Sequence, residues 1–151
     1  VPDDVLTRLP ENGGVVMITF VPSFISTEVR DWGQLSEAER EGRRAPRATI
    51  DDVIRHIEHV RDLAGIDNIG IGADFDGITS VPVGLEDVST FPALFVELAR
   101  RGWSEDAMRK LAGENIMRAW REAEEAAGRI QRTRGPSTKT IEELDGGTIS
   151  R

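Results

Sequence analysis

The chain has 151 residues, a formal net charge of −8, two histidines and no cysteine. Its length is normal for one domain with a real core, and its negative charge argues against nucleic-acid binding, which needs clustered positive charge. The lack of cysteine excludes disulfides and thiolate metal sites and fits a reducing cytoplasm, where we expect the protein. No stretch approaches the ~18 apolar residues of a membrane helix, so we expect no membrane partner.

The first third of the chain predicts a helix, a strand and a long connection. Acids in the first turn favour a short helix over Asp3–Leu9, and Val15–Phe20 predicts a buried strand. Residues 21–48 predict an exposed connection with one or two helical turns around Glu37–Glu41. Because loops of this length inside compact domains are usually functional, we expect a lid or an insertion here.

The remainder predicts helices around a second strand. An N-cap at Thr49 and a stop at Gly65 bracket an amphipathic helix, and the apolar run Ile69–Ala73 predicts a strand. Further helices are predicted between Pro92 and Gly102, from Ser104 to Ala112 and over Asn115–Ala127. We therefore expect a folded part over 1–127 and an extended tail over 128–151.

The most informative pattern is the end of the second predicted strand, where Ala73 is followed by Asp74, Phe75, Asp76 and Gly77. While the strand persists, the two carboxylates point to the same face. Acids at the carboxyl end of a buried strand favour catalysis or ligand binding. The alternative is that one aspartate caps the following loop and the other is solvated. These residues alone leave both interpretations open.

Two histidines and four large apolar side chains also stand out in the sequence. His56 and His59 lie three residues apart on one helix, without the His-Glu-x-x-His spacing of zinc peptidases. They flank the apolar stripe, which favours a surface or interface role over metal binding. Trp32 is expected to anchor the long connection. Three side chains at helix-packing positions are predicted to lie in the core: Trp103, Met117 and Trp120.

Five blocks of sequence, in order, carry a family resemblance. They are Val1–Leu6 with Asn12–Phe20, Gly70–Gly77, Gly84–Ser89, Gly102–Glu105 and Gly113–Asn115. Together they resemble the membrane dipeptidase (renal dipeptidase) family of zinc peptidases. They cover nearly all of residues 1–127, and the resemblance is to the C-terminal part of such an enzyme only.

The resemblance implies an α/β fold, the C-terminal portion of a TIM-like (β/α)8 barrel. A complete barrel takes about 250 residues, and two parallel strands with several helices cannot close one. The chain also begins at Val1, inside a family block. We therefore expect the N-terminal barrel portion on a companion chain, in another segment of the protein, or lost by truncation.

The resemblance also implies a hydrolase: a dipeptidase with two zinc ions and a dipeptide substrate. The family's metal ligands would precede Val1, so no metal ligand is predicted in this chain. Asp74 matches the catalytic aspartate of the final strand, which binds the amino end of the substrate and passes a proton to the leaving amine. Asp76 is assigned to orienting the loop. Phe24 is a candidate wall of the substrate pocket, with a core or loop-anchoring role equally open.

Some features depart from the family pattern. Ala73 stands where relatives commonly have glycine, and Val21–Phe24 stands where some have tyrosines. The polar C-terminus lacks the hydrophobic tail through which animal relatives are lipid-anchored, so a soluble form is expected. The alternatives are a non-catalytic truncated relative or structural subunit and, more remotely, another binuclear amidohydrolase. We expect this chain alone to be inactive, and a homo-oligomer is possible.

Overall fold

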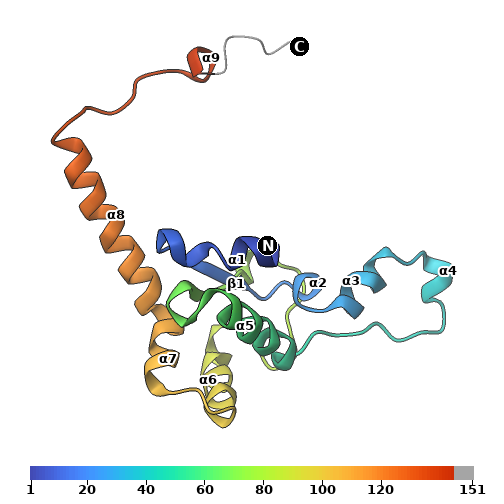
Figure 1. The fold of residues 1–151 in the computed structure, drawn as a ribbon. Coiled ribbons are helices and arrows are strands. Elements are labelled where there is room, and N and C mark those ends of the chain that lie inside the picture. Colours follow the sequence, from blue (N-terminus) through green and yellow to red (C-terminus); the bar gives the residue numbers. More distant parts are fainter. Residues whose placement is uncertain (145–151) are drawn as a thin grey trace. The chain divides into compact units, whose positions relative to one another are not determined.

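The structure, a computed structural model, describes residues 1–144. The chain divides into two compact units, Val1–Ala119 and Trp120–Arg151. The helices before the last third are α1 (Asp3–Leu6), α2 (Pro22–Ile25), α3 (Thr27–Gln34), α4 (Glu37–Arg40), α5 (Ile50–Ala64) and α6 (Phe91–Arg100) (Figure 1). They are followed by α7 (Glu105–Arg109), a π-helical segment Lys110–Glu114, α8 (Asn115–Gln131) and α9 (Ile141–Leu144).

Two parallel strands form the sheet of the first unit, β1 (Val16–Thr19) and β2 (Ile69–Ala73). Both predicted strands are confirmed. Parallel neighbours need a crossover connection, and α5 supplies it. Ile18 pairs with Ile71 but Thr19 pairs with Ala73, so β2 carries one extra residue at its carboxyl end. That residue makes a β-bulge, a feature common at barrel rims and beside active sites.

Helix α5 has the boundaries and the buried face that the sequence predicts. The Thr49 amide N–H and hydroxyl both donate to Asp52 Oδ2, at 2.7 and 2.9 Å, which satisfies a donor at the helix start. Gly65 ends the helix with a φ of 82° that favours glycine. The apolar side chains that α5 buries are Val53, Ile54, Ile57, Val60 and Ala64.

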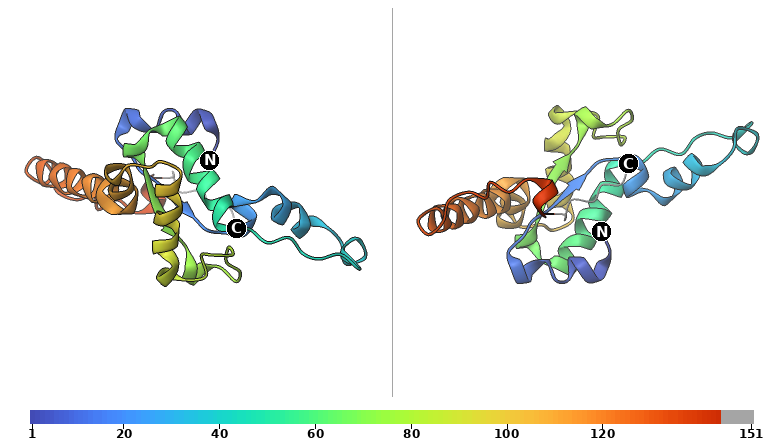
Figure 2. Two further views of the ribbon diagram at one scale, coloured as in Figure 1. Left: turned by 90° about the horizontal axis from the view of Figure 1, so that it is seen from below. Right: turned by 90° about the horizontal axis from the view of Figure 1, so that it is seen from above.

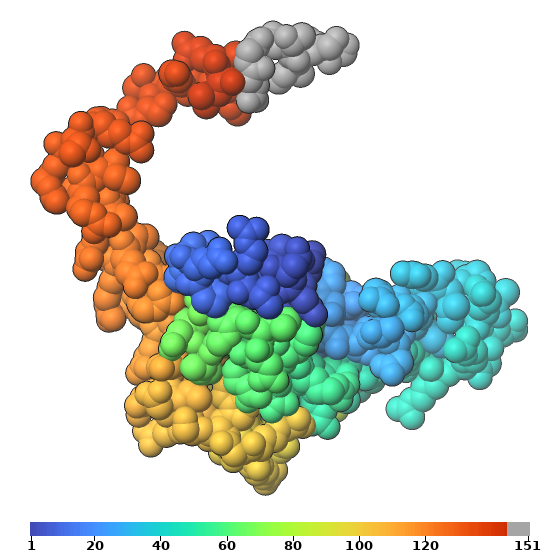
Figure 3. Space-filling model, viewed as in Figure 1, coloured from blue at the N-terminus to red at the C-terminus, as the bar shows by residue number. Residues whose placement is uncertain are grey.

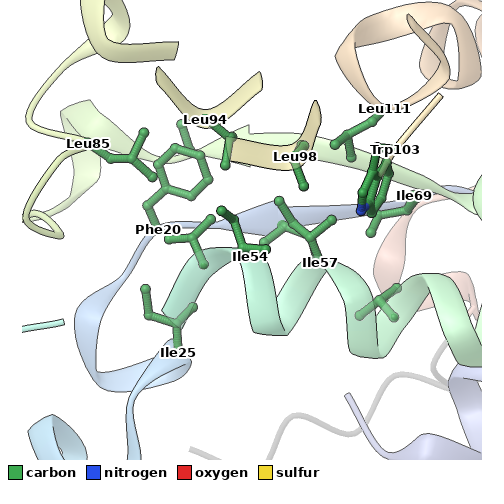
Figure 4. Packing of buried hydrophobic residues seen from close by; sticks show 14 of the residues in the cluster. Phe20, Ile25, Ile54, Ile57, Ile69, Leu85, Leu94, Leu98, Trp103 and Leu111 are labelled. Carbon is green, nitrogen blue, oxygen red and sulfur yellow. The ribbon is translucent and has the colours of Figure 1, made fainter. Parts of the chain in front are cut away.

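The core lies between the strands and two helices, α5 and α6, which cover the same face of the sheet (Figures 1 and 2). Ile54 and Ile57 of α5 meet Leu94 and Leu98 of α6, and all four side chains are fully buried (Figure 4). Trp103 is 7% exposed, so its predicted core position is confirmed.

Met117 and Trp120 do not lie in the core: they are 48% and 63% exposed, and this prediction is wrong. Both belong to α8, which is amphipathic as predicted and continues to Gln131. Amphipathic spacing shows which face of a helix is apolar, but a second element must pack on that face to bury it. No such element covers these two side chains within the described residues.

The connection after β1 is more helical than predicted, because α2 and α3 precede the expected turn at α4. The Ser26 hydroxyl caps α3 by accepting from the Val29 N–H at 3.4 Å. Trp32 anchors the segment as expected, with the guanidinium carbons of Arg40 and Arg43 6.0 and 5.3 Å from its ring centre. In Figure 3 the segment stands out from the rest of the first unit, in light blue and cyan.

The C-terminal third also differs in detail from the predicted helices. The helix expected from Ser104 to Ala112 is α7 followed by the π-helical segment. In the described part of the predicted tail, α9 forms a short helix, and residues 145–151 of that tail lie outside the described residues. Within residues 1–144, none of the helices combines the length and the apolar character that crossing a bilayer requires.

Candidate active site

The carboxyl end of β2 turns sharply, and two consecutive non-glycine residues there have positive φ. Ala73 has a φ of 51° and Asp74 a φ of 76°. The Asp74 N–H donates to Gly72 O at 2.6 Å, while the Phe20 N–H donates to Ala73 O at 2.7 Å and holds the strand end against β1. Non-glycine residues in this region cost on the order of 1–3 kcal/mol each and cluster at functional sites.

The strand therefore ends before the two acids, and the same-face arrangement expected for Asp74 and Asp76 does not form. Asp74 is the left-handed residue after the strand, and Asp76 lies in a 3-10 turn, Phe75–Gly77. The bulge and the positive φ values redirect the chain, so the alternation of a strand no longer applies. Both carboxylates are exposed.

The Asp74 carboxylate lies over the backbone of Gly77. A Cβ at Gly77 would stand 2.7 Å from Asp74 Oδ1, so a side chain at this position would require the carboxylate to move. The Gly77 N–H also donates to Asp74 O at 3.0 Å, closing the turn. Within residues 1–144 the Asp74 carboxylate has no hydrogen-bond or ion-pair partner. Its oxygens are therefore available to a ligand.

Three phenylalanine rings pack together and anchor the turn through Phe75. Phe20, which follows β1, is fully buried and makes edge-on contacts with Phe75 and Phe91 at 5.7 and 6.0 Å between ring centres. Phe75 and Phe91 lie 5.8 Å apart. Such pairs add about 0.5–1.5 kcal/mol each beyond area burial. Sequence reasoning missed this cluster, although an apolar residue between two exposed acids was a signal for an anchor.

Phe24 and Asp76 are the other predicted site residues. Phe24 lies on α2, is 69% exposed and lines a cavity of about 550 Å³ whose lining does not include Asp74. The role of Phe24 as a wall of the substrate pocket stays a prediction. Asp76 makes no hydrogen bond to the loop within residues 1–144, and its loop-orienting role likewise stays a prediction.

The two histidines lie apart from this turn, on α5. His59 Nε2 lies 2.9 Å from Asp3 Oδ1, while His56 is half-buried. Burial first, and then the charge of His59, lower the pKa of His56 below its usual value. Over residues 1–144, no three side chains of histidine, cysteine, aspartate or glutamate form a group that could hold a metal ion. The described residues therefore do not fit a zinc site by themselves.

Two buried side-chain amides form hydrogen bonds at the amino end of the sheet, which is the end opposite to Asp74. Asn115 is 3% exposed, and its Nδ2 donates to Ile66 O and Ile69 O at 2.6 and 2.8 Å. Asn68 Nδ2 donates to Gly14 O at 2.7 Å and joins β2 to the residues before β1. Asn115 belongs to one of the family blocks, but its bonding could not be read from the sequence, because its partners lie 46 and 49 residues away.

Comparisons with known proteins agree with this geometry. A sequence profile of the membrane dipeptidase family, peptidase family M19, matches residues 1–134. An uncharacterized dipeptidase of Schizosaccharomyces pombe is 45% identical over 126 residues, which are 83% of this chain and 27% of that protein. The chain thus spans about a quarter of the length of this curated relative.

Solved structures also show a similarity to metallopeptidases and dipeptidases. A metallopeptidase from Rhodobacter sphaeroides, bound to a phosphinate mimic of the dipeptide L-Ala-D-Ala, superposes with a TM-score of 0.60 at 34% identity. The match covers 77% of this chain and 29% of that one. The probable dipeptidase PvdM from Pseudomonas aeruginosa, at 23% identity, shares the fold with a TM-score of 0.63 over 80% of this chain and 40% of its own. The predicted partial TIM-like barrel is therefore confirmed, and the chain belongs to the membrane dipeptidase family.

Proposed function

We propose that this chain is the C-terminal part of a metallo-dipeptidase and that it contributes Asp74 to catalysis. The observation that carries the proposal is the strained end of β2, where a left-handed Asp74 presents a carboxylate that has no partner among residues 1–144. The family's dipeptidase chemistry and the dipeptide mimic bound by the Rhodobacter sphaeroides relative support a dipeptide substrate.

The proposed role of Asp74 follows from its charge and exposure. An ionised carboxylate binds the ammonium group at the amino end of a dipeptide, through a charge-assisted hydrogen bond. The same oxygens can accept a proton and pass it to the amine that leaves when the peptide bond is cleaved. The lack of a side chain at Gly77 leaves space for the carboxylate in this position, and we propose that this position suits catalysis, because positioning of a catalytic group lowers a barrier.

The metal site of the complete enzyme is a separate part of the proposal. The family consists of metallopeptidases, and we propose two zinc ions held by residues outside this chain, since the described residues offer no metal-binding group. We also propose a cytoplasmic location, because a cysteine-free sequence suits a reducing compartment.

The test is a comparison of Asp74→Asn and Asp76→Asn in the complete enzyme. Asp74→Asn keeps the size of the side chain but removes its charge and its ability to accept a proton. We expect kcat for dipeptide hydrolysis to fall by about 10²–10⁴-fold, with the metal content unchanged. Asp76→Asn should be milder. Near-normal turnover in Asp74→Asn together with inactive Asp76→Asn would show that the wrong carboxylate was assigned.

A non-catalytic subunit is the second candidate, and the lack of a metal-binding group in the described residues favours it. Metal analysis of the purified chain, with and without the remainder of a barrel, separates the two candidates. The dipeptidase proposal expects metal and hydrolysis only when the two parts are combined. Two zinc ions bound by this chain alone would contradict the assignment of the ligands to the remainder.

A further inference from the structure

Residues 27–47, which we call the arm, stand out from the rest of the first unit (Figures 2 and 3). Contacts within the arm support it. The Ser36 hydroxyl accepts from the Glu39 N–H at 3.4 Å, and the Glu39 carboxylate accepts from the Ser36 N–H at 2.8 Å, a capping box that begins α4. Arg40 Nη2 donates to Gly33 O at 2.9 Å and joins α4 to α3. The arm therefore has an ordered surface of its own.

A groove of about 460 Å³ lies on the arm, between α3 and the return stretch 41–47. Three half-buried apolar side chains line it: Trp32 of α3, Leu35 directly after α3, and Pro46 of the return stretch. The guanidinium carbon of Arg43 lies 5.3 Å from the centre of the Trp32 ring, so the two segments meet at the groove. Partly exposed apolar side chains in a groove can gain burial when another molecule covers them.

The two walls of the groove carry opposite charges. Glu28 and Asp31 belong to the α3 wall, while Arg43 and Arg44 belong to the return stretch. No ion pair joins the two walls among residues 1–144, and Arg44 has neither a hydrogen bond nor an ion pair there. Asp31 pairs with the neighbouring Arg30 at 3.2 Å, but both side chains are exposed, and such pairs are weak. Charges of both signs are therefore available to a partner.

We propose that this groove is an interface between two copies of this chain, related by a two-fold axis, with Asp31 of each copy next to Arg44 of the other. In a two-fold pair every contact occurs twice. The acidic wall of each groove then faces the basic wall of the other, and two acids meet two arginines. The aromatic ring of Trp32 and the arginines are also residue types that protein interfaces favour.

A partner with one sign of charge fits the groove less well. An acidic peptide or a nucleic acid would meet Glu28 and Asp31, and a basic peptide would meet Arg43 and Arg44. Like charges placed opposite each other disfavour binding. A second copy avoids this conflict because it brings both signs in the matching order. The proposal rests on the arm alone and is independent of the role of Asp74 and of the rest of the barrel.

The test exchanges the charges of the two walls in the full chain and measures the dissociation constant of the dimer by analytical ultracentrifugation. Asp31→Arg and Arg44→Glu each place like charges opposite each other and should weaken the homodimer by about tenfold or more. An equimolar mixture of the two variants should restore association, because both pairs across the mixed dimer then have opposite charges. Both substituted side chains are exposed, so the circular dichroism spectra should be unchanged.

The matched control for Arg44→Glu is Arg132→Glu, which makes the same change of charge at an exposed position outside the arm. It should leave association unchanged. Raising the salt concentration should weaken the wild-type dimer, because salt screens ion pairs between exposed side chains.

A thiol measurement reports on the groove directly. Since the chain has no cysteine, Leu35→Cys and Thr79→Cys each introduce a single thiol. Modification of the thiol at position 35 by an aqueous reagent should slow as the protein concentration rises and the dimer forms. The thiol at position 79, in an exposed loop outside the arm, should react at the same rate throughout. Adding Arg44→Glu to Leu35→Cys should restore the faster rate at position 35.

Three outcomes would overturn the proposal. A wild-type monomer, with a constant reaction rate at position 35, would leave the groove to a different partner. A dimer that neither charge exchange weakens would form through another face. Weakening by both variants without recovery in their mixture would show that the two walls do not face each other. Recovery in the mixture supports the interface whatever turnover Asp74→Asn shows, so this inference and the catalytic assignment fail separately.

Discussion

The two ends of the two-stranded sheet are built in opposite ways. At the amino end, the buried Asn115 and Asn68 amides donate to backbone carbonyls at 2.6–2.8 Å. At the carboxyl end, Ala73 and Asp74 adopt positive φ, and the Asp74 carboxylate has no partner within residues 1–144. At the amino end, the buried polar groups form hydrogen bonds with one another. At the carboxyl end, a charged carboxylate is exposed and available to a ligand.

This difference indicates that the amino end of the sheet contributes to stability and the carboxyl end to function. A buried amide that donates hydrogen bonds stabilises the folded state, because the carbonyls that accept them would otherwise be buried without a partner. A strained residue with an exposed carboxylate does not help folding, and such residues persist where a site needs them. In barrel enzymes the active site lies at the carboxyl ends of the strands, while the other end serves stability. Variants at the two ends should therefore change different measurements.

The largest effect on stability is expected from Asn115→Ala. The change removes the donor to two carbonyls in the interior, and unsatisfied buried groups cost about 1–3 kcal/mol each. The free energy of unfolding of the assembled protein should fall by about 2–4 kcal/mol in urea titrations. Turnover of the folded protein should stay near normal.

Asn12→Ala is the matched control, because the exposed Asn12 side chain accepts one hydrogen bond, from Gly14 N–H at 2.8 Å. Its loss should cost less than about 1 kcal/mol. If Asn115→Ala left stability intact but reduced turnover as Asp74→Asn is expected to, the division between the two ends would be wrong.

A smaller and purely functional effect is expected from Gly77→Ala. The new methyl group would lie 2.7 Å from Asp74 Oδ1, so the carboxylate must move. Displacement of a catalytic group by about 1 Å can cost on the order of 10²-fold in rate, and we expect kcat of the complete enzyme to fall by about 10–10²-fold. Gly33→Ala is the control, since nothing lies within 4 Å of its added methyl. Equal activity in both variants would mean that Gly77 does not position Asp74.

The parts of this fold that depend on local patterns were predictable. Helix α5 follows from the N-cap at Thr49, the apolar stripe and the stop at Gly65, and β2 follows from its apolar run. The importance of Asp74 could be inferred from its place after a buried strand. Each of these signals lies within a few residues of the feature that it predicts.

The parts that depend on distant partners were not predictable. Trp103 is buried in the connection between α6 and α7, whereas Trp120 on α8 is exposed, and only the packing of other elements distinguishes these two side chains. The bonds of Asn115 reach back 46 and 49 residues. The bulge and the positive φ of Ala73 have no signal in the sequence, because alanine ordinarily avoids that conformation.

The smallest expected effect concerns pH and His56 on α5. Burial lowers the pKa of His56 below the usual value near 6.5, so the unfolded chain takes up this proton before the folded chain does. The free energy of unfolding should therefore fall as pH decreases through about 6.5 and level off below the folded-state pKa. Urea midpoints at pH 7.5 and 5.5 should differ less in His56→Gln than in wild type.

The ring protons of His56, assigned with His59→Gln, give a direct measurement by NMR titration. His56 should titrate below its usual range in the free chain. The same titration after a change that exposes the ring should lie closer to the usual value, because burial is the first cause of the lowered pKa. A His56 that titrates at or above the usual value in the folded chain would contradict the expected loss of stability at low pH.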